Sequence, residues 1–585
     1  MGRIVVVSAS NDGEYGSWYA SSPSSGLNVI SVGSVKNTIL NIQDTIVSNE
    51  CRIHYMLLEN LEIPAGVPIY ATSQDPTIVD NACNPLSSNT PDLSNCLVLI
   101  CCSTCPFVNK TNNTAAYSTQ YFLIYNNVNG PLVAISTNYT STLISQQDGL
   151  FLLQEGIPNN YTISFSDSPL IIENPIGGLM SPFSTYGPTY NMYLKPAISA
   201  PGGAILSTIP VALGSWSIES RTSIAAPYIA GSAALLLKIK GNKAKTASLQ
   251  GAGLINVYHA IKNIGSLLPA ELLLNNTANF NGTHTLTIRN GRNKLVIYTF
   301  THVPAGTANT IQGIKAVSGP IPLTGSSANM EFAPTELNIP AGELLQVQVT
   351  IAPPAKVDAT RFPVFSGYIR ATGSDNTTLQ CTYMGLAASL KDAKLIDNTD
   401  DYFGVKLPLI IDKDGNPVAP DQTITYTLND VNTPLVIYRL AMGTPLLCMH
   451  LVDSTTNVTC ASRCSTQSNN KPAGYSDRFT TLGSNYPKRS VMDWVFSRVC
   501  QSCGGVPTLG VLLEAEYFPR NTISPTPEQG GYSAVNIRQF SNGTMIPDGD
   551  YRIKVQALKI FGDLNAPGDY EVWTSPAIQI RRALD

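Results

Sequence analysis

Apolar residues near the start of the chain come in unbroken runs and do not alternate with polar ones. Residues 4–9 (IVVVSA) and 29–35 (VISVGSV) are two such runs, and a Gly/Ser-rich turn separates them. Continuous β-branched runs of this length are typical of parallel strands that are covered on both faces. The pattern therefore predicts two buried parallel strands within residues 1–50.

The pattern changes between about residues 51 and 165. Short strand-like runs such as 97–100 and 122–125 alternate there with cysteines and Asn-x-Thr sequons. Near residue 174 the first pattern returns, and residues 195–203 read KPAISAPGG. We interpret the middle stretch as a module inserted into an α/β domain.

The strongest helix prediction covers residues 223–240. This stretch is apolar almost all round, so we expect a buried helix. Pro227 lies close to the first turn, where a missing backbone N–H costs little. A shorter helix is predicted at 255–264.

Strand patterns dominate beyond about residue 267. The runs 284–288, 294–301, 345–351 and 365–371 alternate or are β-rich, and turns such as IPAG at 339–342 separate them. This texture is typical of β-sandwiches. We predict a multidomain chain in which an α/β domain with a parallel sheet (1–50 and 166–266) carries an insertion (51–165). Two all-β sandwich domains follow, at 267–386 and 387–585.

Composition narrows the functional classes. Only 13% of the 585 residues are charged and the net charge is −4, so a nucleic-acid partner has no support. No run approaches the ~18 apolar residues of a membrane span. The opening apolar run is too short for a secretory signal peptide. Because the chain begins inside a predicted core strand, we expect it to be truncated.

The twelve cysteines fall into a front group and a back group. Their even number favours disulfides and an oxidising compartment. The back group also permits a four-thiolate zinc site from Cys460, Cys464, Cys500 and Cys503. Nine Asn-x-Thr sequons are about as many as the abundance of Asn, Ser and Thr produces by chance. They lie at Asn109, Asn112, Asn138, Asn160, Asn275, Asn281, Asn376, Asn457 and Asn542.

Ser223 is the residue that carries a chemical hypothesis. A serine at a helix start is commonly a cap, but there the helix dipole and free backbone N–H groups also favour a hydroxyl nucleophile. Residues 221–231 read RTSIAAPYIAG and resemble the active-serine motif of the subtilisin-like proteases, GTSMAxPxVAG. Three further segments resemble that family in the same order: 5–13 (VVVSASNDG), 195–203 and 250–256 (QGAGLIN).

The resemblance implies a subtilisin-like serine protease, closest to large secreted fungal subtilases. It implies that Ser223 is the nucleophile and that the Asn11 side-chain amide lies in the oxyanion hole. It also implies that 51–165 is a protease-associated domain and that the sandwiches are Fn3-like. Substrates would be proteins or peptides outside the cell or at its surface, with no metal and no cofactor.

The chain departs from the family at its catalytic base. The family order is Asp, His, Asn, Ser, yet neither a histidine nor an aspartate precedes Asn11. The five histidines, none of them in a His-Gly-Thr setting, are His54, His259, His284, His302 and His450. We therefore expect the N-terminal half of the catalytic domain to be missing and this chain to lack endopeptidase activity.

Further departures keep a second hypothesis open. Arg221 and Ser10 replace glycines of the family, and we expect Arg221 to fill the site or strain its loop. The connection between residues 240 and 250 is short for the family. The alternative is a catalytically inactive subtilase-like protein that binds peptides or proteins.

Overall fold

The computed structural model describes the chain as two compact units. The described residues are 4–56, 61–78, 81–102, 104–128, 132, 135, 137–211, 215–240, 254–429, 431–455, 508–524 and 530–582, without the side chains of 166–168, 236–240 and 259. Unit 1 comprises Met1–Gly33, Pro182–Ser199 and Ile229–Asp585, and unit 2 comprises Ser34–Ser181 and Ala200–Tyr228. Three elements run from one unit into the other: β2 (Ile30–Lys36), β10 (Ile198–Gly203) and α3 (Thr222–Lys240).

The two opening runs form the predicted parallel strands. β1 (Val6–Ser8) pairs in parallel with β2, in a sheet of order β1-β2-β10. β1 is an edge strand, and Ile4 and Val5 before it are exposed, so the expectation of burial on both faces is wrong at this end. Burial of β2 is more complete, with Val32 and Val35 in the core.

The long helix forms where its sequence predicts, but it is not buried all round. α3 begins one residue before the predicted start. Thr222, Ala225, Ile229 and Ala233 are buried at helical spacing, which defines one inward face. Tyr228 and Leu235 are about half exposed, so the predicted burial holds for only one side of the described part of the helix. The second helix, α4 (Val257–Lys262), is shorter than predicted.

Unit 2 contains a separate α/β module between β2 and β10. Its antiparallel sheet has the order β4-β3-β9, from β3 (Ile39–Val47), β4 (Arg52–Tyr55) and β9 (Ile163–Glu173). Its parallel sheet runs β5-β6-β7-β8, from β5 (Ile69–Ala71), β6 (Leu97–Cys101), β7 (Tyr121–Tyr125) and β8 (Thr140–Ile144). Two short helices accompany them, α1 (Phe107–Ala115) and α2 (Gln146–Phe151).

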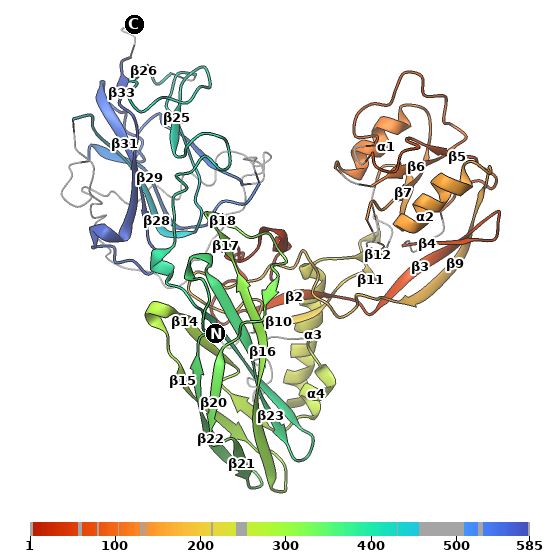
Figure 1. Ribbon diagram of the computed structural model, residues 1–585, viewed down its shortest axis with the longest axis horizontal. Helices are drawn as coiled ribbons and strands as arrows, with labels where there is room; N and C mark the ends of the chain where they lie inside the picture. The colour runs from red at the N-terminus through yellow and green to blue at the C-terminus, as the bar shows by residue number, and fades with distance from the viewer. Residues whose placement is uncertain are drawn as a thin grey trace. The chain divides into compact units, whose positions relative to one another are not determined.

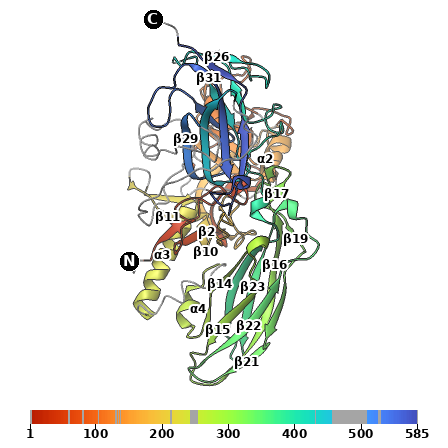
Figure 2. The same ribbon diagram turned by 90° about the vertical axis from the view of Figure 1, so that its left-hand side faces the viewer.

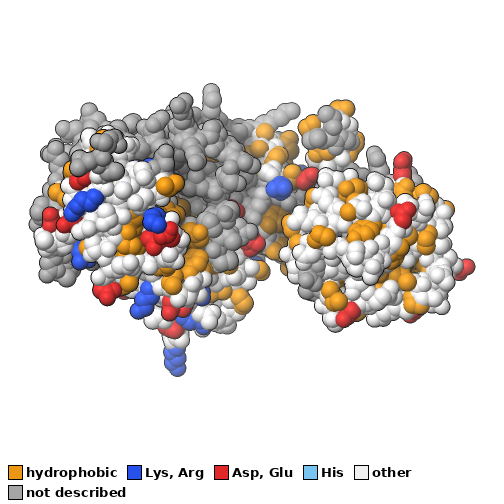
Figure 3. Space-filling model, turned by 90° about the horizontal axis from the view of Figure 1, so that it is seen from above, with side chains coloured by type: hydrophobic (Ala, Val, Ile, Leu, Met, Phe, Trp, Pro, Cys, Tyr) orange, Lys and Arg blue, Asp and Glu red, His pale blue; other side chains and the backbone are white. Residues whose placement is uncertain are grey.

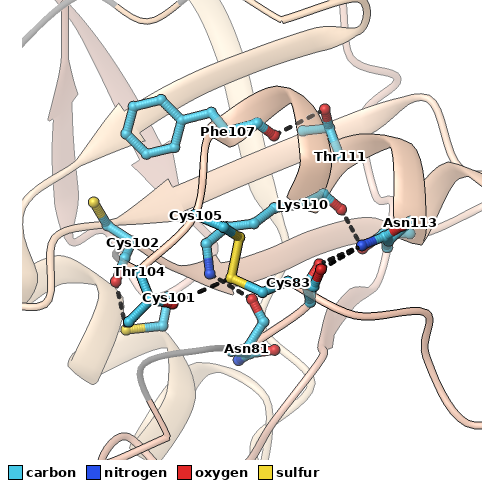
Figure 4. The surroundings of a disulfide bond; sticks show 12 residues. Asn81, Cys83, Cys101, Cys102, Thr104, Cys105, Phe107, Lys110, Thr111 and Asn113 are labelled. Carbon is cyan, nitrogen blue, oxygen red and sulfur yellow. Dashed lines mark hydrogen bonds between the residues drawn. A yellow bond between two sulfur atoms is a disulfide. The ribbon is translucent and has the colours of Figure 1, made fainter. Parts of the chain in front are cut away.

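A disulfide joins the start of α1 to the chain before β6. Cys83 and Cys105 form this bond, and Figure 4 shows it beside α1. The fully buried Lys110 donates from Nζ to the Asn81 carbonyl at 2.5 Å, and the Asn113 amide donates to the Cys83 carbonyl at 2.9 Å. Among the described cysteines this is the one disulfide, while Cys51, Cys96, Cys101, Cys102 and Cys381 are thiols. The four cysteines of the zinc alternative and Asn457 lie outside the described residues.

Residues 266–386 form a β-sandwich, drawn in green in Figures 1 and 2. One sheet has the order β13-β15-β22-β20, from β13 (Ser266–Leu268), β15 (Thr283–Arg289), β22 (Leu344–Ala352) and β20 (Asn329–Ala333). The other has the path β14-β24-β23-β16-β19 with β21 beside β16. Its strands are β14 (Glu271–Asn276), β24 (Thr378–Leu386), β23 (Pro363–Gly373), β16 (Val296–Asn309), β19 (Leu323–Thr324) and β21 (Glu336–Ile339). Alternating buried residues such as Val347, Val349 and Ile351 fill the space between them.

The C-terminal module has two further sheets. The smaller sheet has the order β25-β27-β30, from β25 (Leu409–Ile411), β27 (Leu435–Tyr438) and β30 (Ser533–Asn536). The larger has the path β26-β33-β31-β28-β29 with β32 beside β31. Its strands are β26 (Ile424–Tyr426), β33 (Ile578–Ile580), β31 (Gly549–Leu558), β28 (Thr444–Asp453), β29 (Gly510–Phe518) and β32 (Tyr570–Thr574).

The core of the C-terminal module also takes in side chains from elsewhere in unit 1. Trp18 and Met192, from the two segments that flank unit 2 in sequence, are each 1% exposed in this core. Ile311 and Phe362 of the green sandwich join the same cluster. This core is therefore shared between the C-terminal module and the other modules of unit 1, while the sandwich of residues 266–386 also has a separate core between its sheets.

Few of the residues are charged, 13% of the chain. On the face in Figure 3, charged side chains are sparse among hydrophobic and other atoms. In the described part of the chain, no helix combines the length and the apolar character that crossing a membrane requires.

Candidate active site

Ser223 occupies the second position of α3 and is exposed. Thr222 before it is fully buried, so the helix start is anchored by its neighbour and presents the serine outward. The first N–H groups of a helix lack intrahelical partners and carry the positive end of the dipole. An oxygen that gains negative charge near Ser223 would be stabilised by both.

A glycine allows the start of α3 to approach β10 closely. The Arg221 N–H donates to the Gly202 carbonyl at 2.8 Å. A Cβ on Gly202 would lie 2.7 Å from the Arg221 carbonyl oxygen and 2.8 Å from Cβ of Ala225. The APGG sequence of 200–203 therefore has a local physical role, because it lets the serine helix lie against the sheet.

Arg221 does not strain its loop as expected. It is exposed, and it is not among the residues with positive φ. The other departure behaves differently, because Ser10 has a φ of +88°, in the region that favours glycine. Backbone strain from a replaced family glycine is found at Ser10.

The loop that carries Asn11 is held by hydrogen bonds with residues 183–185. The Thr185 N–H donates to the Ser10 carbonyl at 3.0 Å, and the Asp12 N–H donates to the Thr185 hydroxyl at 2.7 Å. The Gly13 N–H donates to the Phe183 carbonyl at 2.9 Å. Asn11 itself is half-buried. It belongs to unit 1 and Ser223 to unit 2, so their assignment to one catalytic centre is a proposal that needs a chemical test.

The described histidines make contacts within their own modules. His54 Nε2 lies 3.4 Å from the Asp44 carboxylate in unit 2, and His284 Nε2 lies 2.8 Å from the Asn281 carbonyl. His302 Nε2 lies 2.6 Å from the Tyr383 hydroxyl, and burial lowers the pKa of His302. His450 is fully buried on β28, and the side chain of His259 lies outside the described ones. Within the described residues, no histidine is shown bonded to Ser223.

Lys195, at the start of the KPAISAPGG segment, has a structural role. Its Nζ donates to the carbonyls of Gly26 and Val29, at 3.0 and 3.2 Å, and so holds the chain that leads into β2. Burial lowers the pKa of Lys195, and nearby Glu271 opposes that shift. Among the described residues, no group of three His, Cys, Asp or Glu side chains is placed to hold a metal ion. Residues 241–253, which include the short connection and most of QGAGLIN, lie outside the described part.

Comparison with known families identifies the N-terminal domain. Residues 1–279 match the model of the Subtilase family, and residues 272–384 match that of an Fn3-like domain. Residues 1–279 are therefore a domain of the subtilase family, and an Fn3-like domain follows it directly. The multidomain class and the green sandwich fit this layout.

Curated relatives carry protease names. The PI-type proteinase of Lactococcus lactis subsp. cremoris is 26% identical over 344 residues, covering 44% of this chain and 17% of that protein. The minor extracellular protease Vpr of Bacillus subtilis (strain 168) is 26% identical over 257 residues, covering 38% and 31%. A C5a peptidase of Streptococcus pyogenes serotype M3 is 38% identical over 98 residues, covering 17% and 8%. The chain thus spans less than a third of the length of each of these relatives.

Proposed function

We propose that this chain carries the nucleophile and the oxyanion donor of a subtilisin-like serine endopeptidase. The observation that supports this most is the exposed Ser223 at the start of α3, inside the family's serine motif. Gly202 lets this helix start pack closely against β10. In this assignment Ser223 Oγ attacks the peptide carbonyl and forms an acyl-enzyme. Water then releases the acyl group.

Asn11 and the start of α3 have the second role in this proposal. The carbonyl oxygen becomes an oxyanion during attack, and the Asn11 amide together with helix N–H groups would stabilise it. Loss of one such donor costs about 100- to 1,000-fold in rate. The contacts of the 10–13 loop with 183–185 support a preorganised amide, which is what this kind of catalysis requires.

We further propose that the 585-residue chain alone has no appreciable endopeptidase activity. A serine hydroxyl of this family needs an imidazole that accepts its proton. The contacts shown for His54, His284 and His302 are with groups other than Ser223. In this proposal, attack by Ser223 requires a base other than the described histidine side chains. The alternative is a catalytically inactive relative that binds peptides or proteins, which the exposed Arg221 beside Ser223 favours.

The remaining assignments follow the family. We infer that the substrates are proteins or peptides and that the protein acts outside the cell or at its surface, as the name of the extracellular relative suggests. We also infer that residues 51–165 are a protease-associated domain that influences substrate access. The domain bounds 1–50 with 166–266, 267–386 and 387–585 are part of the same proposal.

Chemical rescue tests the nucleophile. Hydrolysis of a p-nitrophenyl ester is measured with increasing free imidazole, using wild type, Ser223→Ala and Asn11→Ala. We expect imidazole-dependent hydrolysis above the Ser223→Ala background, and at least a tenfold loss in Asn11→Ala. Equal rates in wild type and Ser223→Ala would contradict the role of Ser223 and favour the binding alternative.

A further inference from the structure

Arg520 lies in the C-terminal module, beyond both ranges that the family models match. It follows β29 and is 2% exposed. Its Nη2 donates to the carbonyl of Tyr15 and, at 2.9 Å, to that of Ser17, while Nη1 donates to the Asn521 carbonyl at 3.1 Å. The guanidinium therefore binds the backbone of a segment more than 500 positions earlier in the sequence.

Burying the charged guanidinium of Arg520 costs free energy. Within the described part of the chain it makes no ion pair, and its Nε has no hydrogen-bond partner. Burial lowers the pKa of Arg520. A buried cation without a carboxylate partner is costly unless its hydrogen bonds compensate. Nearby Arg439 is also buried, but its charge is compensated by an ion pair with Asp397 at 3.1 Å inside its own module.

The segment that Arg520 binds is residues 13–19, which we call the anchored segment. It begins two residues after Asn11. The Fn3-like domain contacts it from backbone to backbone, because the Gly319 N–H donates to the Glu14 carbonyl at 2.9 Å. A Cβ on Gly16 would lie 2.1 Å from the Val317 carbonyl, and Gly16 has a φ of +77°.

Side chains complete the attachment of the anchored segment. Trp18 Nε1 donates to the Thr310 hydroxyl at 2.9 Å, and the Tyr190 hydroxyl donates to the Trp18 carbonyl at 2.8 Å. The Tyr19 ring lies 5.2 Å from the Arg520 guanidinium carbon. The C-terminal module and the Fn3-like domain thus fix one short stretch together.

We propose that Arg520 is a positioning residue for the Asn11 loop. From the C-terminal module it fixes the conformation of the anchored segment, and through it the backbone on which Asn11 is carried. This inference deepens the proposed function and rests on the oxyanion role of Asn11, whereas its conformational part can be tested without any activity. It gives the C-terminal module a task at the candidate active site.

Hydrogen exchange on the full chain tests the conformational part. The variants are Arg520→Met, Arg520→Lys and, as a matched control, Arg552→Met. Arg552 also bonds carbonyls, those of Ser454 and Ser575, but within its own module. We expect amides of residues 10–19 to exchange about tenfold faster or more in Arg520→Met, because charged hydrogen bonds to the segment are lost.

The other variants separate positioning from general destabilisation. Arg520→Lys should give an intermediate rate, because an ammonium cannot reproduce the guanidinium fork. Peptides from β28 should keep wild-type exchange in Arg520→Met, and Arg552→Met should leave residues 10–19 unchanged. Unchanged exchange of 10–19 in Arg520→Met, or equal acceleration in β28, would overturn the proposal.

The link to Asn11 has its own readout. In the imidazole-dependent hydrolysis, Arg520→Met should lower the rate in the same direction as Asn11→Ala, and Arg552→Met should not. Faster exchange with an unchanged rate would contradict the link to Asn11. If wild type shows no Ser223-dependent hydrolysis, the proposed function fails, and the exchange data still decide whether Arg520 positions the segment.

Discussion

The two stretches that carry the candidate active-site residues differ in how they are held. Residues 10–19 are bonded by three other parts of unit 1: residues 183–190, the Fn3-like domain and Arg520. The start of α3 contacts β10 through Arg221 and Gly202, and Ser223 itself is exposed. The serine motif, which is the easier of the two to recognise in the sequence, is thus held by fewer contacts than residues 10–19.

This difference teaches how sequence motifs relate to structure. A serine that reacts with a substrate has to be accessible, so the residues of its motif pack against the protein on one side of the helix only. An oxyanion donor has to be preorganised, so its support comes from distant parts of the chain. Such support leaves no local pattern.

The largest expected effect compares two tryptophans. Trp18→Ala should lower the free energy of unfolding of unit 1 by about 3–5 kcal/mol, because Trp18 is 1% exposed in the shared core. Trp216→Ala, in the strand before Ser223, should change stability by less than about 0.5 kcal/mol, because Trp216 is 58% exposed. Urea unfolding of both variants measures the difference in stability, and similar midpoints would contradict this prediction.

A smaller effect tests the one tight contact at the start of α3. Gly202→Ala should cost about 1–3 kcal/mol, because its Cβ would meet the Arg221 carbonyl and Ala225. Gly231→Ala, further along α3, should stabilise by about 0.5–1 kcal/mol, because its Cβ meets open space and alanine favours helix. A neutral Gly202→Ala in thermal unfolding would show that the helix start is looser than described.

The two departures from the family should respond differently to glycine. At Ser10, glycine should be more stable than alanine by about 1 kcal/mol, because φ is +88° there and both variants lack the hydroxyl. At Arg221, which is not among the positive-φ residues, glycine should be no more stable than alanine. Urea midpoints of the four variants decide this, and a glycine preference at Arg221 would restore strain at the serine motif.

The smallest effect concerns the pH dependence of the Fn3-like domain. Burial holds the pKa of His302 below its usual value of about 6.5, so the unfolded chain binds more protons in that window. Stability should therefore fall as pH drops from about 6.5 through the folded pKa. His302→Gln should flatten this dependence in pH-resolved unfolding, whereas His284→Gln should keep it.

Much of the fold is predictable from local patterns. The apolar run of 223–240 gives α3, and alternation gives β15 and β22, because these periodicities are properties of a single element. α1 was not predicted, since its sequence FVNKTNNTA is rich in Asn and Thr, which favour turns and caps. The inserted domain and the domain bounds remain predictions.

The candidate site is predictable only in part. Ser223 and Asn11 were assigned from motifs that lie near each residue in the sequence, and these roles stay proposals. Arg520 was missed because it binds backbone carbonyls, which every residue has, so no particular partner residue in the sequence indicates its role. Its role depends on contacts across hundreds of residues, which the sequence alone does not display.

The most direct test of the central claim is the intact mass of the purified chain after exposure to a fluorophosphonate, without imidazole. We predict no adduct on wild type, because no described histidine side chain is shown bonded to Ser223. An adduct on wild type that maps to Ser223 and disappears in Ser223→Ala would contradict this account, because it would show that the chain activates its own serine.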